Sequence, residues 1–267
     1  MKKIRVFVSG AGGKMGREVV RTILDQEDMQ LVGASDARQQ GRDIGELLAM
    51  ASLGIEITGP LEEAHLKETR ADIVVDFTNP QSVLKNAKCA LAAGVVPVLG
   101  TTGLDEADIS EIRDLVDQTK VGAFIAPNFA IGAILMMRFA QEAAKYFPHV
   151  EIIELHHDQK LDAPSGTALK TVEWISEVRK PLVQGHPNEY EKIKGSRGGD
   201  VDGIHIHSVR LPGFIAHQEV IFGGLGQALT IRHDALSRET YMPGIMLAIR
   251  KAGQLSNLVI GLENFLE

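Results

Sequence analysis

Apolar runs and amphipathic segments alternate along the first half of the chain. Runs rich in β-branched residues predict buried strands, and apolar residues three or four positions apart predict the helices between them. The expected elements are strands over 4–8, 30–35, 71–76, 95–99 and 121–126, and helices over 14–24, 81–93 and 106–120. This alternation predicts an α/β fold with a Rossmann-like, doubly wound parallel sheet. Ligands bind at the carboxyl ends of such strands, so loops 10–16, 77–80, 100–103 and 126–129 would line one crevice.

The pattern changes after Phe129. An amphipathic helix begins near Ile131, and a strand over 151–155 leads to a helix that starts within 164–167. Strand-like runs over 203–211, 217–222 and 227–232, joined by glycine-rich turns, predict a mainly antiparallel sheet, and 238–252 is helical again. We therefore expect two domains, one formed by 1–129 and 236–267 and an α+β domain over 130–235.

Composition narrows the class of protein. The 267 residues suffice for two domains that each bury a core. A net charge of -7 argues against nucleic acid as a partner, because phosphate binding needs a basic face. The single cysteine, Cys89, cannot form an intrachain disulfide, which suits a reducing compartment. The start lacks a signal peptide, and no window reaches the length of a membrane span, so we expect a cytoplasmic protein without a membrane partner.

A glycine-rich turn follows the first predicted strand. Gly10, Gly13 and Gly16 let the backbone approach a pyrophosphate, which would rest on the N-terminus of the next helix. Gly12 also fills the middle position of the commoner G-x-G-x-x-G pattern. Asp36 ends the second predicted strand at the distance where a carboxylate binds the adenosine ribose. The turn, helix and acidic residue together predict a dinucleotide site.

A second cluster lies between Glu151 and Ala168. His156, His157 and Lys160 follow a predicted strand, and Pro164-Ser165-Gly166-Thr167 is typical of a helix start whose amides bind carboxylates. Two proton-transfer candidates and a cation beside such amides indicate an acidic substrate and proton chemistry. His205 and His207 share a strand face and could form a metal pair. Without a nearby carboxylate or cysteine pattern we expect no metal site.

The motifs together resemble the dihydrodipicolinate reductase family. The resemblance covers essentially the whole chain and rests on the glycine turn, Asp76-Phe-Thr, Gly100-Thr-Thr-Gly, Asn128-Phe, the long segment Glu154-Leu-His-His-x-x-Lys-x-Asp-Ala-Pro-Ser-Gly-Thr, and Ser237-Arg238. It implies reduction of a cyclic imine dicarboxylate, 4-hydroxy-tetrahydrodipicolinate, to tetrahydrodipicolinate by NADH or NADPH in diaminopimelate and lysine biosynthesis. It also implies a homotetramer assembled through the sheet of the second domain.

The motifs and the resemblance assign the site residues. Reduction moves charge onto the substrate, so His156 is the expected general acid and Lys160 the cation that stabilises developing charge. The expected substrate-binding residues are His157, Ser165, Gly166, Thr167 and Thr102. The expected cofactor-binding residues are Gly10, Ala11, Gly12, Gly13, Lys14, Met15, Gly16, Asp36, Arg38, Phe77, Gly100, Thr101, Thr102, Ala126, Pro127, Asn128, Phe129 and Arg238.

Cofactor preference stays open at this point. Asp36 favours NADH because a carboxylate repels a 2'-phosphate. Some relatives place an arginine directly after this acid, whereas here Ala37 stands there and Arg38 follows. Since Arg38 or Lys14 could reach a phosphate, we expect both cofactors to work.

Two alternatives keep the layout but change the function. One is an amino-acid or aldehyde dehydrogenase of the aspartate or homoserine dehydrogenase type, and the other is a dinucleotide sensor that has lost catalysis. The His-His-x-x-Lys and Ser-Gly-Thr pair argues against the first, and intact His156 and Lys160 argue against the second. If the two domains carry the cofactor and substrate separately, hydride transfer also requires them to close, with hinges near Phe129 and Ser237.

Overall fold

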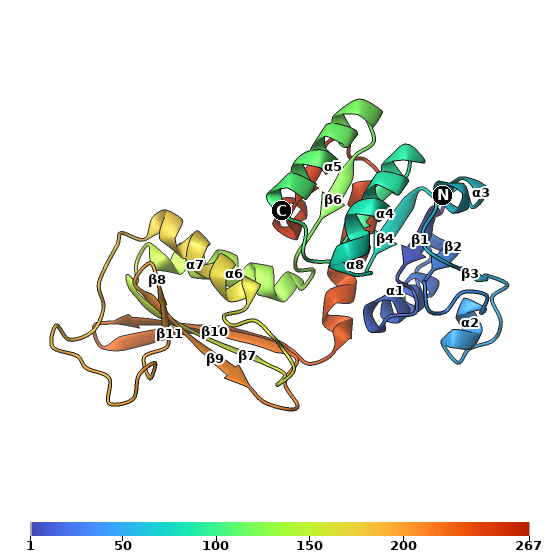
Figure 1. Cartoon of the computed structure of the whole chain (residues 1–267). Coiled ribbons are helices and arrows are strands. Elements are labelled where there is room, and N and C mark those ends of the chain that lie inside the picture. Colours follow the sequence, from blue (N-terminus) through green and yellow to red (C-terminus); the bar gives the residue numbers. More distant parts are fainter. Residues whose placement is uncertain (1, 267) are drawn as a thin grey trace. The chain divides into compact units, whose positions relative to one another are not determined.

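The computed structural model describes residues 2–266, which divide into two compact units (Figure 1). The first unit contains the chain up to Phe129 and the segment from Tyr241 onward, and the second contains Ala130–Thr240. Residues 236–240, which include Arg238, thus lie with the second unit. None of the helices within 2–266 is both long enough and apolar enough to cross a lipid bilayer.

A parallel sheet forms the centre of the first unit, in the order β12-β6-β5-β4-β1-β2-β3. Its strands are β1 (Ile4–Ser9), β2 (Met29–Ser35), β3 (Ile57–Thr58), β4 (Ile73–Asp76), β5 (Val96–Leu99), β6 (Ala123–Ile125) and β12 (Leu258–Ile260). The order reverses beside β1, which is the switch point where doubly wound sheets bind ligands. The predicted Rossmann-like fold is therefore confirmed, although the short strands β3 and β12 were not predicted.

Helices connect the strands of the first unit. They are α1 (Lys14–Leu24), α2 (Ile44–Leu47), α3 (Glu63–Glu68), α4 (Pro80–Ala92), α5 (Glu106–Thr119) and α8 (Met242–Ala252), with the 3-10 helices η1 (Arg238–Tyr241), just before α8 and partly in the second unit, and η2 (Leu262–Phe265) near the C-terminus. Local chemistry sets their ends: Asn79 caps α4 with Pro80 in the first turn, Asp105 and Asp108 form a capping box on α5, and Lys120 ends α5 in the left-handed region. The predicted helix over 238–252 is thus a 3-10 turn followed by α8.

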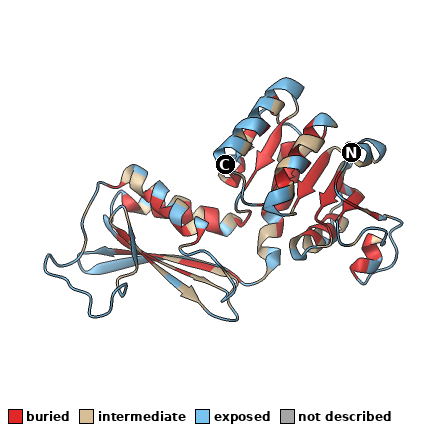
Figure 2. Ribbon diagram, viewed as in Figure 1, coloured by how far each residue is buried: buried red, intermediate tan, exposed pale blue. Residues whose placement is uncertain are grey.

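Two clusters of buried residues form much of the core of the first unit. On one face α4 and α5 bury Val83, Leu91 and Ile112 against β5 and β6. Phe7, Leu66 and other buried residues join α3 and α4 to the middle of the sheet. Figure 2 shows that the central strands β4, β5 and β6 are buried along nearly their full length, as expected for parallel strands covered by helices.

The sheet of the second unit has the order β11-β10-β7-β9-β8. Its strands are β7 (His149–His156), β8 (Gly199–Val201), β9 (Ile204–Arg210), β10 (Ala216–Gly224) and β11 (Gln227–Ala235). The sheet is mainly antiparallel, as predicted, but β7 and β9 pair in parallel, and β7 separates β9 from β10. The expectation that successive runs pair as hairpins holds only for β10 and β11. The chain between β7 and β9 is long enough for the crossover that a parallel pair requires.

Two helices pack on the sheet of the second unit, α6 (Ile131–Ala144) and α7 (Gly166–Val178). Ser165 caps α7 by accepting a hydrogen bond from the Ala168 amide at 3.2 Å. Gln218 of β10 donates to Thr171 Oγ1 of α7 at 2.7 Å, so Gln218 faces the helices. Residues that stand opposite each other on neighbouring strands point to the same face of a sheet. Glu154 stands opposite Gln218, and Ser208 stands opposite Glu154, so both also face the helices.

Candidate functional site

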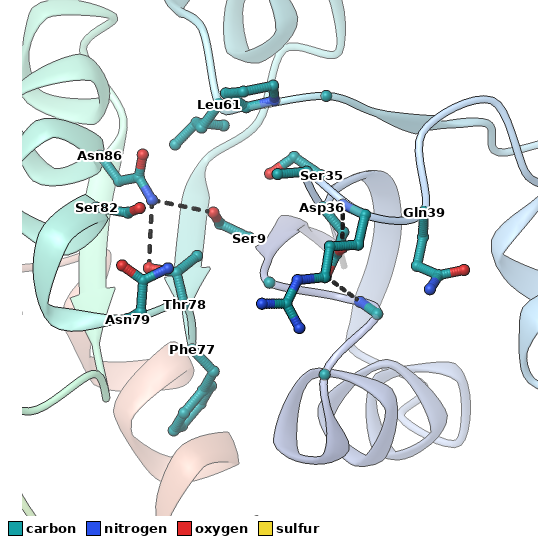
Figure 3. A pocket seen from close by; sticks show the side chains of 17 residues that line it. Ser9, Ser35, Asp36, Gln39, Leu61, Phe77, Thr78, Asn79, Ser82 and Asn86 are labelled. Carbon is teal, nitrogen blue, oxygen red and sulfur yellow. Dashed lines mark hydrogen bonds between the residues drawn. The ribbon is translucent and has the colours of Figure 1, made fainter.

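A cavity of about 450 Å³ opens at the carboxyl ends of β1, β2 and β4 in the first unit. It has the size of a small-molecule site and lies at the switch point of the sheet. The residues that line it are Ser9, Gly10, Gly12, Gly13, Ser35, Asp36, Ala37, Arg38, Gln39, Gly59, Pro60, Leu61, Phe77, Thr78, Asn79, Ser82 and Asn86 (Figure 3). The expected cofactor residues Gly10, Gly12, Gly13, Asp36, Arg38 and Phe77 are among them.

The glycines of the first turn leave room that no other residue would leave. Gly10 has φ +78°, and a Cβ there would meet the Phe77 carbonyl oxygen. A Cβ on Gly16 would meet the Gly10 carbonyl oxygen, so Gly16 lets α1 pack closely on the turn. The α1 amides then follow directly after an open glycine turn, the arrangement that binds a pyrophosphate. The first unit therefore fits a dinucleotide.

Besides lining the cavity, Asp36 binds the backbone of the glycine turn. Its Oδ2 accepts a hydrogen bond from the Gly12 amide at 3.0 Å, and its Oδ1 accepts one from the Arg38 amide at 2.9 Å. Figure 3 shows Asp36 on the cavity wall beside Gln39. The carboxylate thus joins the loops that follow β1 and β2, and it places a negative charge where the adenosine ribose is expected.

Sequence reasoning missed a buried polar network around Asp76, which includes the cavity-lining residues Ser9, Thr78 and Asn86. Asp76 at the end of β4 has no exposed surface, and its carboxylate accepts hydrogen bonds from Thr78 Oγ1, Asn86 Nδ2 and Thr101 Oγ1, each at 2.7 Å. Asn86 also donates to Ser9 Oγ at 3.4 Å (Figure 3). A polar Asn86 on the buried side of a helix was the available signal, because buried polar groups need partners.

The remaining expected cofactor residues do not line this cavity. Two of them, Gly100 and Phe129, lie against the cavity-lining Phe77: the Phe77 ring lies 5.8 Å from that of Phe129, and a Cβ on Gly100 would clash with it. Thr101 binds Asp76, and Thr102 is exposed. The other expected residues outside the lining are Ala11, Lys14, Met15, Gly16, Ala126, Pro127, Asn128 and, in the second unit, Arg238.

The second unit contains a charged network at the end of β7. Glu154 has no exposed surface, and its Oε2 lies 2.5 Å from His156 Nδ1. Arg210 of β9 donates to both carboxylate oxygens, at 2.7 Å to Oε1 and 2.9 Å to Oε2. Burial raises the pKa of Glu154, but hydrogen bonds from His156, Arg210 and Ser208 outweigh it and lower that pKa to about 2. Glu154 is therefore ionised at neutral pH.

The same network reaches Lys160. Arg210 Nη2 also donates to the Asp162 carbonyl oxygen at 2.9 Å, and Lys160 Nζ forms an ion pair with Asp162 Oδ1 at 2.7 Å. The hydrogen bond from Lys160 is the main cause of a lowered Asp162 pKa. The Lys160 side chain is only 20% exposed. The structure therefore links the expected acid and the expected cation through Arg210, which the sequence motifs did not identify.

The other expected substrate residues follow in the same segment. His157 is exposed and comes directly after β7, while Ser165 is buried as the cap of α7. Gly166 begins the helix with open space where a Cβ would stand, and Thr167 accepts a hydrogen bond from Thr171 through its carbonyl oxygen. Within the second unit the sequence thus places a histidine pair, a lysine and a helix start in one connected segment.

His205 and His207 also lie on β9, but they stand opposite Glu151 and Ile153 and not beside the network around Glu154. His207 Nε2 bonds Glu151 Oε2 at 2.8 Å, and Arg197 also pairs with that carboxylate. Across residues 2–266, no three His, Cys, Asp or Glu side chains gather in a way that could hold a metal ion.

Comparisons with known proteins cover both units. The family model for the dihydrodipicolinate reductase N-terminus matches residues 4–129, and the model for its C-terminus matches 132–266. The chain is 98% identical over its full length to the 4-hydroxy-tetrahydrodipicolinate reductase of Desulfitobacterium hafniense strain DCB-2, covering all of both chains. It is 53% identical to the protein of that name from Syntrophomonas wolfei, covering 99% of each.

Solved structures agree with this result. A dipicolinate-bound dihydrodipicolinate reductase from Paenisporosarcina sp. TG-14 is 47% identical, with a TM-score of 0.85 over 99% of this chain and 100% of that one. An amine dehydrogenase from Mycobacterium smegmatis is 15% identical, with a TM-score of 0.69 over 97% of this chain and 95% of that one. At that identity the likeness concerns the fold alone.

Proposed function

The chain belongs to the dihydrodipicolinate reductase family, and we propose how its two units carry out that family's reaction, the reduction of 4-hydroxy-tetrahydrodipicolinate to tetrahydrodipicolinate. The chain is a nicotinamide-dependent oxidoreductase that uses NADH or NADPH, and it acts in diaminopimelate and lysine biosynthesis. The first unit would hold the cofactor and the second unit the substrate.

The glycine turn and Asp36 support the cofactor half. The turn would bind the pyrophosphate through backbone amides at the start of α1, and Asp36 would accept hydrogen bonds from the ribose hydroxyls. The Phe77, Gly100 and Phe129 loops would complete the site toward the nicotinamide. When bound, the cofactor supplies a hydride.

The charged network supports the substrate half. A dicarboxylate would place its carboxylates on His157 and on the first-turn amides of Ser165, Gly166 and Thr167. Lys160 would hold negative charge on the substrate, and His156 would give a proton to the atom that gains electrons. Reduction then balances: the 4-hydroxyl leaves as water together with a proton from the adjacent ring carbon of the substrate, and the conjugated imine that remains takes up one hydride and one proton.

The observation that carries this proposal is the link between His156 and Lys160 through Glu154, Arg210 and Asp162. The test mixes the protein with NADPH and freshly formed aldolase product from pyruvate and aspartate semialdehyde, and follows the loss of absorbance of the reduced cofactor. Rapid loss is expected. Turnover of aspartate or homoserine instead would favour the dehydrogenase alternative, and cofactor binding without any turnover would favour a sensor.

Hydride transfer needs both halves at one substrate, so the proposal includes closure of the two units during turnover. The connections near Phe129 and Ser237 would act as hinges. Structures solved with and without cofactor and dipicolinate would test this. Identical relative placement of the units in both would contradict it.

We further propose a cytoplasmic homotetramer. Gln218 faces α7, so its neighbours His217 and Glu219 face the opposite side of the sheet with Ile153 and Ile221. The half-buried isoleucines and the Glu219–Arg232 ion pair on this side suit contact with another copy. Light scattering should give four times the 29.0 kDa chain mass, and a monomer would contradict the assembly.

A further inference from the structure

Within the proposed function of His156, one residue outside the reacting groups determines how the ring is presented. We infer that Glu154 is a positioning residue that binds His156 Nδ1 and leaves Nε2 as the nitrogen that delivers the proton. The two residues are separated by one position on β7, so their side chains share the face that α7 covers. The contact of 2.5 Å joins Nδ1 to a carboxylate oxygen. An ionised carboxylate only accepts, so Nδ1 must donate.

Arg210 fixes the carboxylate itself. Two guanidinium nitrogens donate to the two oxygens of Glu154, a two-point contact that sets the plane of the carboxylate. The pKa of Glu154, lowered to about 2, keeps it an acceptor across the physiological range. Since Arg210 also donates to the Asp162 carbonyl, one side chain holds the acceptor of His156 and the turn after Lys160.

The charged groups around His156 come from its own strand and from β9. Glu154 on its own strand touches the ring, and Arg210 stands opposite His156 on the neighbouring β9. The Lys160–Asp162 pair in the following loop is joined to Arg210 through the Asp162 carbonyl. On the other neighbouring strand, Ala216 of β10 stands opposite His156 and carries no charge. Glu154 is the carboxylate in contact with the ring.

Glu151 provides a matched control on the same strand. It also accepts from a histidine and an arginine, at 2.8 Å from His207 Nε2 and 2.5 Å from Arg197 Nη2. Its side chain points to the opposite face of the sheet from Glu154, because the two are three positions apart. Glu151→Gln removes the same kind of charge from the same strand without touching His156.

The first test needs no change to Glu154. Nitrogen-15 NMR of the His156 ring in the intact protein, at a pH where the ring is neutral, should find the proton on Nδ1. His156→Gln identifies the signal by its loss. A neutral ring protonated on Nε2 would overturn the inference. This result does not depend on turnover, so it decides the role of Glu154 even if the proposed reaction fails.

The second test compares kcat and KM. Glu154→Gln should lower kcat by about tenfold or more and change KM for the substrate by less than about threefold, because the amide places an N–H against Arg210 and no longer balances the charged ring. Glu151→Gln should keep the wild-type kcat, with assembly checked by light scattering because Glu151 stands opposite Ile221 on the face proposed for contact with another copy. Equal kcat values for both variants, with folding checked by circular dichroism, would reject Glu154 as the residue that positions His156. If Glu154→Gln does not fold, the NMR measurement decides. An inactive wild type would reject the proposed function instead.

Discussion

Asp76 and Glu154 are both carboxylates without exposed surface, and both stand at or near the end of a strand, but their partners differ in kind. Asp76 is surrounded by neutral donors from Thr78, Asn86 and Thr101. Glu154 is bound by the ionisable His156 and by Arg210. The first carboxylate fixes loops around a cavity, while the second holds the groups that would move a proton. A buried acid alone therefore does not indicate catalysis, and its partners decide.

Lys160→Met should give the largest effect on the charged side of this comparison. Loss of the cation beside a dicarboxylate should lower kcat/KM by a factor that corresponds to about 3 kcal/mol or more of transition-state stabilisation, with both a higher KM and a lower kcat. Steady-state kinetics with NADPH would measure it. Lys145→Met removes an exposed lysine paired with Glu142 and should leave kcat/KM unchanged. Affinity for NADH should not change in either variant.

The stability contributed by Glu154 should depend on pH. Its pKa falls from 4.5 to about 2 on folding, so its contribution is fully present above pH 4.5 and is lost as the pH falls through about 2. The difference in unfolding free energy between wild type and Glu154→Gln should therefore shrink by roughly 3 kcal/mol between pH 6 and pH 2.

Urea unfolding followed by Trp174 fluorescence would measure this difference. Trp174 is the single tryptophan of the chain and lies on α7, so it reports on the second unit. A difference that stays constant with pH would show that the Glu154 pKa is not lowered in the folded protein.

His156→Gln should separate proton delivery from binding. We expect kcat to fall by about 100-fold, or about 2.7 kcal/mol, with a smaller change in KM, because a proton donor acts in the transition state. His149→Gln changes the exposed histidine at the other end of β7 and serves as the control. A near-normal kcat for His156→Gln would assign the proton to water or to His157.

Asp36→Ala should give the smallest effect, on the cofactor side. Lost ribose hydrogen bonds should weaken NADH binding by about 1–2 kcal/mol and NADPH binding less, because a repulsive charge is also removed. Fluorescence titration with each cofactor would measure this. Equal weakening of both would mean that Asp36 acts only through its support of the Gly12 turn.

The sequence predicted what local patterns determine. Strand, glycine turn and helix at residues 4–24 and the capped start of α7 follow from periodicity and turn chemistry, and both are present in the structure. The two-residue strand β3 and the three-residue β12 carry too little pattern to be recognised. The parallel pairing of β7 with β9 depends on contacts far apart in the chain, which periodicity does not encode.

The candidate site shows the same division. His156, Lys160 and Ser165 lie in one short segment, so a motif could bring them together. Arg210 is 56 positions from Glu154 and comes beside it only through the register of β7 and β9. The hydrogen bond from the Gly12 amide to Asp36 likewise spans 24 positions.

That last hydrogen bond limits how the coenzyme preference of this protein can be redesigned. Replacing the acid after β2 is the usual way to admit a 2'-phosphate, yet here the same carboxylate braces the pyrophosphate turn. A variant without it would gain phosphate tolerance and lose rigidity in the loop that both coenzymes need. Ala37 and Gln39 line the cavity, and no hydrogen bond joins either side chain to Gly12, so a basic residue at one of these positions offers the better route to NADPH.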